Sequence, residues 1–372
     1  MQRRVKPHPV GVALRRAFRF VVLYLVVAAL ATPLQQAWAN LQDDSAVIAE
    51  KPVGGADWES APALREGWRQ DYTRPAPVML DASAEVRAKL GMLLFFDPVL
   101  SGARTMACAS CHQPANAWSD KKENAVGENG LSMRVRSPSL ENVALADRLG
   151  WDGKFPSLES VTFRAISGKN NMDLAEAEAL GRLQGSPAYN RLFQQAFGTT
   201  LITKEKVEQA LAVFERGLVS GVAPFDRWVA GDETAVGVAA KRGFAVFDGK
   251  GECSACHAGW AFSDHSFQDI GFASGNDRGR GMYFPKSVAL QYAFKVPTLR
   301  NVLVHAPFMH DGSKASALSV IDHYDGGGID RPGRSHHIHP LNLTARDKSD
   351  LISFLASLTS DRQNFPVPLL PR

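Results

Sequence analysis

The chain of 372 residues contains four cysteines, and all four belong to two C-x-x-C-H motifs: Cys108, Cys111 and His112, then Cys253, Cys256 and His257. The two thiols of such a motif can form thioether bonds to the vinyl groups of a haem. The imidazole of the next residue can then bind the iron as its proximal ligand. The sequence therefore predicts two covalently bound c-type haems, with His112 and His257 as iron ligands.

Other uses of paired cysteines fit these motifs less well. Disulfides are the ordinary use of cysteine in an oxidising compartment, but a pair separated by two residues rarely forms a structural one. A four-cysteine zinc site would need its two pairs much closer than the 145 residues between Cys108 and Cys253. A thioredoxin-like redox pair would not explain a histidine after both motifs.

A second pattern also occurs twice. Residues 138–143 read P-S-L-E-N-V and residues 297–302 read P-T-L-R-N-V, and an Asp-Gly pair follows fourteen residues after each proline. Equal offsets between several short motifs indicate two related haem domains that arose by duplication. Trp151 corresponds to His310 in this alignment, so the surroundings of the two haems are expected to differ there.

Helices are expected to position both motifs. Apolar residues at helical spacing predict helices over residues 83–96, 174–197, 203–219, 235–247, 313–324 and 344–358, and no segment alternates convincingly like a strand. The predicted fold is all-α, with two cytochrome c-like haem domains and long loops. The Gly- and Pro-containing stretch 217–231 is the natural boundary, which gives domains at 40–225 and 226–372.

Residues 1–39 have the pattern of a Sec-type secretory signal peptide. A basic start is followed by an apolar run over residues 20–31 and then by Ala37-Trp38-Ala39. The run is shorter than the ~20 residues of a membrane-spanning helix. We therefore expect a periplasmic protein with no stable membrane span after cleavage, an uncleaved anchor being the alternative. Removing the six basic residues of the signal changes the net charge from +4 to −2, which argues against a nucleic-acid partner.

Over residues 82–358 the chain resembles the family of the bacterial di-haem cytochrome c peroxidases and the related enzyme MauG. The matching segments are residues 90–102, 214–227, 294–301 and 306–312. The resemblance implies that peroxide meets iron at the first haem, on His112, and that the second haem, on His257, stores or relays an electron. It also implies a tryptophan between the two haems at Trp151, for which a packed aromatic side chain is the plain alternative.

The resemblance implies a distal ligand for the second iron fourteen residues after His310, where this chain has Tyr324. Peroxidases of the family carry Met there and MauG-like members carry Tyr. Met ligation raises the reduction potential, whereas an anionic phenolate should favour ferric iron. A tyrosine on the helix surface is the alternative, and the other candidate ligands are His323, His310, Met309 and Met282.

The first haem pocket departs from the pattern of the peroxidases. The resemblance implies a Gln and then a proton-moving Glu, but the corresponding positions hold Val161 and Asn171. Asn can form hydrogen bonds but cannot exchange a proton at neutral pH. The distal His of the peroxidases is replaced by Glu128 or Asn129. The candidate catalytic residues are therefore Trp151, Asn171 and Glu128.

The resemblance also implies calcium between the domains. The usual Asn ligand falls at Arg136, and a cation cannot replace the oxygen ligand that Ca²⁺ requires. The sequence therefore argues against a bound calcium ion at this position.

Three functions follow from these observations. The leading interpretation is a peroxidase that reduces hydrogen peroxide with electrons from a small cytochrome c or copper protein. Tyr324 favours a second function, the MauG-like oxidation of residues on a partner protein. The missing Glu favours a third, a non-enzymatic di-haem electron carrier.

Overall fold

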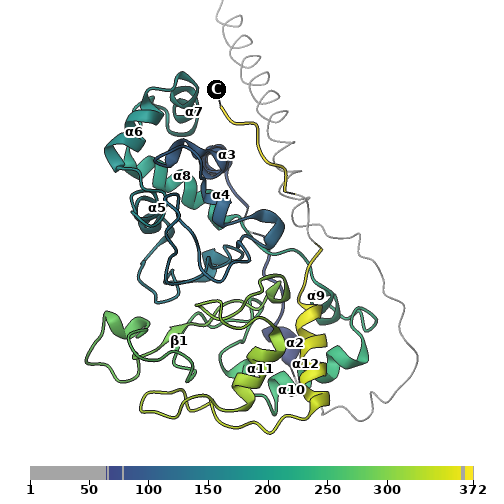
Figure 1. Cartoon of the computed structure of the whole chain (residues 1–372). Coiled ribbons are helices and arrows are strands. Elements are labelled where there is room, and N and C mark those ends of the chain that lie inside the picture. Colours follow the sequence, from purple (N-terminus) through teal and green to yellow (C-terminus); the bar gives the residue numbers. More distant parts are fainter. Residues whose placement is uncertain (1–63, 65–66, 78, 362–364, 372) are drawn as a thin grey trace, which may run out of the picture. The chain divides into compact units, whose positions relative to one another are not determined.

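The computed structural model describes residue 64 and residues 67–77, 79–361 and 365–371 (Figure 1). All of them belong to one compact unit. The predicted signal peptide, residues 1–39, lies outside the described residues. Within the described part of the chain, no helix is long and apolar enough to cross a membrane.

Helices and loops make up nearly all of the described chain. The α-helices are α2 (Trp68–Asp71), α3 (Ala82–Phe96), α4 (Cys108–Cys111), α5 (Leu158–Ile166), α6 (Glu176–Gln184), α7 (Pro187–Phe197), α8 (Lys204–Arg216), α9 (Pro224–Val229), α10 (Val238–Asp248), α11 (Ala317–Asp325) and α12 (Ala345–Ser357). Strands β1 (Phe267–Gln268) and β2 (Phe294–Lys295) pair antiparallel, with Phe267 opposite Lys295. The 3₁₀ turns are η2 (Pro98–Leu100), η3 (Pro114–Asn116), η4 (Val143–Leu145), η5 (Cys253–Ala255), η6 (Arg280–Met282) and η7 (Val302–Val304). The prediction of a mostly helical fold with long loops is confirmed.

Two predicted helices differ from the observed ones, and one observed helix was not predicted. The helix expected over 174–197 is divided into α6 and α7, because the Ser186 side chain caps the amide of Tyr189 and Pro187 takes the first helical position. Helix α11 begins at Ala317 rather than at residue 313, since Ser316 forms its N-cap. Helix α9 lies inside the stretch 217–231, which the sequence reading treated as a boundary.

Two large hydrophobic clusters form most of the core, beside a small third one. The first gathers α3, α5, α6, α7 and α8, and the second gathers α2, α9, α10, α11 and α12. In each large cluster two helices cross at a glycine: Gly91 lets α3 approach α8, and Gly243 lets α10 approach α12. A Cβ at either position would lie 1.9 Å from a backbone oxygen, that of Ala210 or of Asp350. Each pair of helices therefore depends on the missing side chain.

The repeated sequence segments adopt the same local structure. Asn142 and Asn301, which are equivalent in the two P-[ST]-L-x-N-V segments, both have left-handed backbone conformations, with φ of 58° and 56°. The side-chain oxygen of Asn142 accepts a hydrogen bond from the amide of Ser220 at 3.0 Å. That of Asn301 accepts one from the amide of Ser360 at 2.8 Å. The same residue type thus anchors the same loop in both halves.

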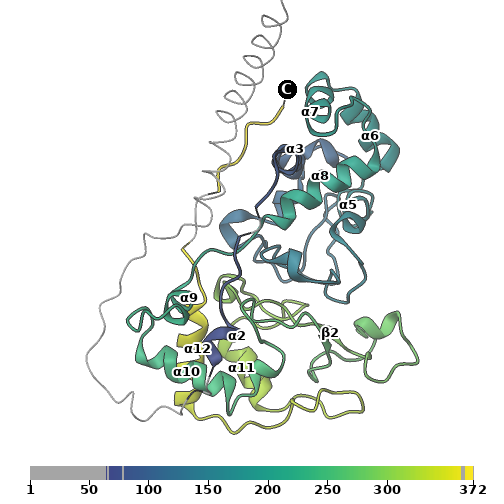
Figure 2. The same cartoon turned by 180° about the vertical axis from the view of Figure 1, so that it is seen from behind.

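Both ends of the described chain cross to the other cluster. Trp68 packs on Phe244 of the second cluster, with ring centroids 4.8 Å apart. Near the C-terminus, Phe365 stacks on Phe96 at 5.7 Å and contacts Trp118 at 5.0 Å, both in the first cluster. Figures 1 and 2 show the C-terminal segment running from α12 towards α3. The domain boundary near residue 225 stays a prediction.

A buried ion pair fixes the start of the second half. Arg300, with no exposed surface, donates two hydrogen bonds of 2.8 Å to the carboxylate of Asp226 in α9. The indole of Trp260 donates to the same carboxylate at 2.9 Å, and the backbone oxygen of Trp260 accepts from Arg300 Nε. Both charges are therefore partnered, as buried charges must be.

Candidate functional site

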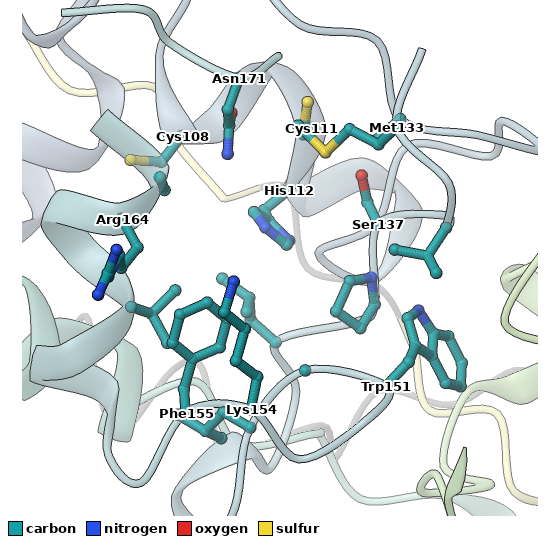
Figure 3. A pocket seen from close by; sticks show the side chains of 18 of the residues that line it. Cys108, Cys111, His112, Met133, Ser137, Trp151, Lys154, Phe155, Arg164 and Asn171 are labelled. Atoms are coloured by element: carbon teal, nitrogen blue, oxygen red, sulfur yellow. The ribbon is translucent and has the colours of Figure 1, made fainter. Parts of the chain in front are cut away.

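Each C-x-x-C-H motif lines its own cavity. The first cavity, of about 480 Å³, is bordered by Cys108, Cys111 and His112, and Figure 3 shows the imidazole of His112 facing into it. The second, of about 240 Å³, is bordered by Cys253, Cys256 and His257. All four thiols are free and partly exposed. Burial raises the pKa of both Cys108 and Cys253 to about 12, so these thiols hold their protons at neutral pH.

The two histidines are oriented in the same way. The Nδ1 atom of His112 lies 3.1 Å from the carbonyl oxygen of Trp118, and that of His257 lies 2.9 Å from the carbonyl oxygen of Phe262. A carbonyl only accepts, so Nδ1 carries the proton and Nε2 is left as the ligand atom. Burial lowers the pKa of both imidazoles, which favours the neutral form that binds iron.

The surroundings of both motifs suit a haem. Each cavity has two thiols, one neutral imidazole and a largely apolar wall, which includes Phe95 and Leu140 in the first and Phe247 and Leu299 in the second. Cationic side chains that can pair with haem propionates also line the cavities: Lys154 and Arg164 in the first, Arg136 and Lys295 in both. The donor set is that of two c-type haem sites.

Trp151 lies in the wall between the two cavities. It borders both of them, as do Arg136, Phe294 and Lys295. The indole nitrogen of Trp151 donates to the backbone oxygen of Arg136 at 3.0 Å, and its own carbonyl accepts from the amide of Lys295 at 2.8 Å. Burial lowers the pKa of Lys295 to about 8. The role between two haems that the resemblance implies for Trp151 stays a prediction.

Arg136 occupies the place where the family resemblance implied a calcium ligand. Its side chain is 4% exposed. The guanidinium donates to the backbone oxygens of Pro307 and His305, and at 3.3 Å to the hydroxyl of Ser119. The guanidinium of Arg136 thus binds carbonyl oxygens from the second half, next to the wall that contains Trp151.

Asn171 and Glu128, which the sequence reading grouped together, have different positions. Asn171 borders the first cavity and points into it (Figure 3). Glu128 does not border it: its carboxylate accepts from the Ser101 hydroxyl at 2.5 Å, the Ala103 amide at 2.8 Å and the Thr105 hydroxyl at 2.9 Å. Burial opposes ionisation of Glu128, but these hydrogen bonds outweigh it and lower the pKa. Glu128 thus stabilises the loop before the first motif, and its side chain does not border the cavity.

Glu215 was not among the site residues predicted from the sequence. It is one of three carboxyl side chains that border the first cavity, with Asp152 and Asp277. Asp152 and Asp277 accept hydrogen bonds from Tyr283 and His310. Burial raises the pKa of Glu215 to about 8 against the opposing effect of Arg216, so this carboxyl holds a proton at neutral pH. Its only sequence signal was its place in the family segment 214–227.

Tyr324, on α11, borders the second cavity together with His257. Burial raises the pKa of its phenol. Of the other candidate ligands, His323 faces the carbonyl of Ile270 at 3.0 Å and does not border this cavity. Met282 borders the first cavity instead. His310 and Met309 border the second, but His310 Nε2 lies 2.6 Å from the carboxylate of Asp277 and is thereby engaged.

The chain is similar to several known proteins. The family described as di-haem cytochrome c peroxidase matches residues 85–234. The methylamine utilization protein MauG of Methylorubrum extorquens is 40% identical over 352 residues, which cover 92% of this chain and 99% of that protein. The cytochrome-c peroxidase IdrP1 of Denitromonas iodatirespirans is 32% identical over 77% of this chain and 85% of that protein.

A solved structure shows the same fold. The crystal structure of a MauG-like protein associated with microbial copper homeostasis matches with a TM-score of 0.70 and 26% identity, over 80% of this chain and 96% of that one. Together with two cavities that each hold a C-x-x-C-H motif, these similarities identify the protein as a haem oxidoreductase. The chain belongs to the di-haem cytochrome c peroxidase/MauG family.

Proposed function

We propose that the protein is a periplasmic di-haem enzyme that uses hydrogen peroxide to oxidise residues of a partner protein, as the MauG resemblance implies. The observation that carries this proposal is the presence of Tyr324 in the second cavity beside His257. Peroxidases of the family have Met at this position, so the tyrosine favours a MauG-like second haem. The higher identity to MauG than to the peroxidase supports the same choice.

The cysteines of each motif would hold one haem by thioether bonds, and His112 and His257 would bind the two irons through Nε2. When bound, the haems would supply the redox chemistry: they would give two electrons to peroxide and recover them one at a time. Tyr324 would be the second ligand of the second iron. Because it borders both cavities, Trp151 would carry electrons between them.

Two polar side chains would act on peroxide in the first cavity. Asn171 points into it and could donate a hydrogen bond to peroxide (Figure 3). Glu215 would hold the proton that the departing water needs, since its pKa of about 8 keeps it protonated at neutral pH. Glu128 has no part in this proposal, because its carboxylate is bound to the loop 101–105.

The similarity to cytochrome-c peroxidases favours a second candidate. In this alternative the protein reduces peroxide with electrons from a small cytochrome c or copper protein. The two candidates differ in the oxidation state that should react, because the peroxidase would draw on an electron stored on its second haem.

Stopped-flow absorbance distinguishes the two candidates. The purified holoprotein, fully ferric or half-reduced, is mixed with stoichiometric hydrogen peroxide while the Soret band is followed. We expect the fully ferric protein to react without prior reduction. Reaction of the half-reduced form alone would establish the peroxidase instead, and a lack of reaction in both forms would leave an electron carrier.

The Glu215→Gln variant tests the proton donor in the same experiment. Wild type should lose rate as the pH rises through about 8, because Glu215 then gives up its proton. The variant cannot titrate, so it should react slowly at all pH values and lack this step. An unchanged pH profile would exclude Glu215 as the donor.

A further inference from the structure

An exposed tyrosine is hydrogen-bonded to a residue that borders the first haem cavity. Tyr283 follows η6, and its side chain is 43% exposed. Its phenol donates to Oδ2 of Asp152 at 2.8 Å. Asp152 borders the first cavity, as does Met282, the residue before the tyrosine. A short path thus leads from the surface to the site on which the proposed function depends.

The same path continues to the wall between the cavities. Asp152, which accepts the hydrogen bond from Tyr283, directly follows Trp151 in the chain. Trp151 borders both cavities. The Lys295 amide holds the Trp151 carbonyl at 2.8 Å. Tyr283 is therefore connected to Trp151 through one hydrogen bond and a few covalent bonds.

An arginine fixes the geometry of this path. Arg280 Nη1 donates to the backbone oxygens of Asp152 and Gly153 at 3.2 and 3.0 Å. Its guanidinium lies 4.4 Å from the ring centre of Phe267 and 5.1 Å from that of Phe284. The turn at Gly153 has a positive φ of 67°, and a Cβ there would lie 2.3 Å from this guanidinium. The segment that carries Tyr283 is thereby attached to the Asp152 turn.

The hydrogen bond between Tyr283 and Asp152 places a proton acceptor beside the phenol. Burial, together with the hydrogen bond to Asp152, raises the pKa of Tyr283 to about 12, so the phenol is protonated at neutral pH. A phenol that loses an electron becomes strongly acidic, and its oxidation is easier when a base accepts the proton in the same step. A carboxylate at 2.8 Å satisfies that requirement.

The surface around Tyr283 can receive a protein. Met282, Phe284 and Val288 on the same segment are 50%, 43% and 57% exposed. Lys286 in this segment is also exposed. In Figures 1 and 2 the chain between β1 and β2, which includes this segment, projects beyond the neighbouring helices. An exposed phenol on such a segment can lie against a residue of another protein.

We propose that electrons from the partner protein enter through Tyr283, which passes them to Trp151 while its phenol proton moves to Asp152. This proposal rests on the proposed function, which supplies peroxide as the oxidant. Tyr283 loses one electron towards the haems and one proton to Asp152 Oδ2. It then takes one electron from the partner and recovers its proton. Two such cycles, with two protons released by the partner's oxidation, convert one hydrogen peroxide into two waters.

Spin trapping with peptide mass mapping tests the proposal. Ferric holoprotein is mixed with stoichiometric hydrogen peroxide and a nitroso spin trap, without any partner, and the adducts are located by mass spectrometry. We expect an adduct on Tyr283 in wild type and its loss in Tyr283→Phe. In Asp152→Asn we expect the adduct to form ~10²-fold more slowly, the lower limit for a missing proton acceptor.

A matched variant controls for the loss of a tyrosine bound to a carboxylate. Tyr189 in α7 is 2% exposed and donates to Asp97 at 2.6 Å, away from both cavities. Tyr189→Phe should keep the Tyr283 adduct at the wild-type yield. An ultraviolet titration without peroxide provides a separate readout, because Asp152→Asn should lower the pKa of the Tyr283 phenol.

The outcomes separate this proposal from the proposed function. If wild type consumes peroxide but no adduct forms on Tyr283, the relay is wrong and the proposed function stands. A Tyr283 adduct that forms at the wild-type rate in Asp152→Asn would refute the role of Asp152. If wild type does not react with peroxide at all, the proposed function fails and the relay fails with it.

Discussion

In the first half of the protein, Nδ1 of His112 donates a hydrogen bond to the carbonyl oxygen of Trp118, and in the second half Nδ1 of His257 donates one to the carbonyl oxygen of Phe262. The two halves therefore present the same ligand atom to an iron in the same way. What surrounds the ligands differs. The first cavity is about twice as large and holds Asn171, whereas the smaller second cavity holds Tyr324. The residues predicted to attach a haem are therefore the same in both halves, and other residues that line the two cavities differ.

The halves also differ in how they hold the repeated loop. Asn142 and Asn301 make equivalent hydrogen bonds to backbone amides. Only one of the two loops carries a buried ion pair, since Arg300 of the second loop corresponds to Glu141 of the first. Glu141 instead accepts from the side chain of Asn301 at 2.7 Å, which links the two loops directly.

The largest effect is expected from breaking that ion pair. Asp226→Asn would leave the buried charge of Arg300 without its counter-ion and should cost about 3–5 kcal/mol of unfolding free energy. The measurement is urea denaturation of the holoprotein. As a control, Glu159→Gln removes a carboxylate that bonds the partly exposed Arg216 at 2.7 Å, which should cost about 0–1 kcal/mol. Equal losses of unfolding free energy in the two variants would contradict a larger contribution from the buried Arg300–Asp226 pair.

Substitution of the two glycines at which helices cross tests whether each half folds and holds its haem separately. Gly91→Ala and Gly243→Ala should each cost at least about 1–3 kcal/mol, because the new Cβ meets a backbone oxygen at 1.9 Å. Haem stoichiometry should show loss of the first haem in Gly91→Ala and of the second in Gly243→Ala. Gly181→Ala is the control: nothing lies within 4 Å of its Cβ, so it should be stabilising by about 0.5–1 kcal/mol. Loss of both haems in either variant would show that the halves do not fold separately.

A smaller effect is expected from His305, whose counterpart in the first half is Ala146. Burial and the nearby Arg136 lower the pKa of His305 from 6.5 to about 3. Between these values the unfolded chain binds a proton that the native protein does not. This group therefore reduces stability as the pH falls from 6.5 towards 3, by up to about 1.4 kcal/mol per pH unit.

His305→Gln, which does not titrate in this range, isolates that contribution. Urea midpoints measured at several pH values between 7 and 4 should fall less steeply for the variant than for wild type. Parallel curves for the two proteins would mean that His305 does not keep its low pKa in the holoprotein.

The smallest effect is expected from removing divalent metals. Because the Arg136 guanidinium already binds the carbonyls of His305 and Pro307, chelation should leave the thermal midpoint and the peroxide reaction unchanged. Arg136→Asn restores the residue that the family resemblance implies and should make the thermal midpoint rise with added Ca²⁺. A fall of the wild-type midpoint on chelation, reversed by Ca²⁺, would contradict the replacement of a metal by Arg136.

The parts of the site carried by local sequence were predictable. The C-x-x-C-H motifs, the repeated P-[ST]-L-x-N-V segments and most helices depend on residues near one another in the chain, and residue type and spacing report them directly. The prediction for Trp151 came from the resemblance alone, and in the structure this residue borders both cavities.

The parts that depend on distant contacts were not predictable. Glu128 was taken for a cavity residue because spacing cannot show that its carboxylate bonds the loop 101–105. Glu215 was overlooked because its raised pKa comes from burial by other segments. Trp68 gives no local sign that it packs on Phe244, far along the chain.

The two halves would hold their haems alike, through His112 and His257, and would differ in whether a second side chain, that of Tyr324, binds the iron. Electron paramagnetic resonance of the fully ferric holoprotein tests this difference directly, with wild type compared to Tyr324→Phe. We expect one high-spin signal from the first haem and one low-spin signal from the second. In the variant the low-spin signal should be lost while the high-spin signal of the first haem stays unchanged. Two low-spin signals in wild type, or a low-spin signal that survives in the variant, would contradict the account.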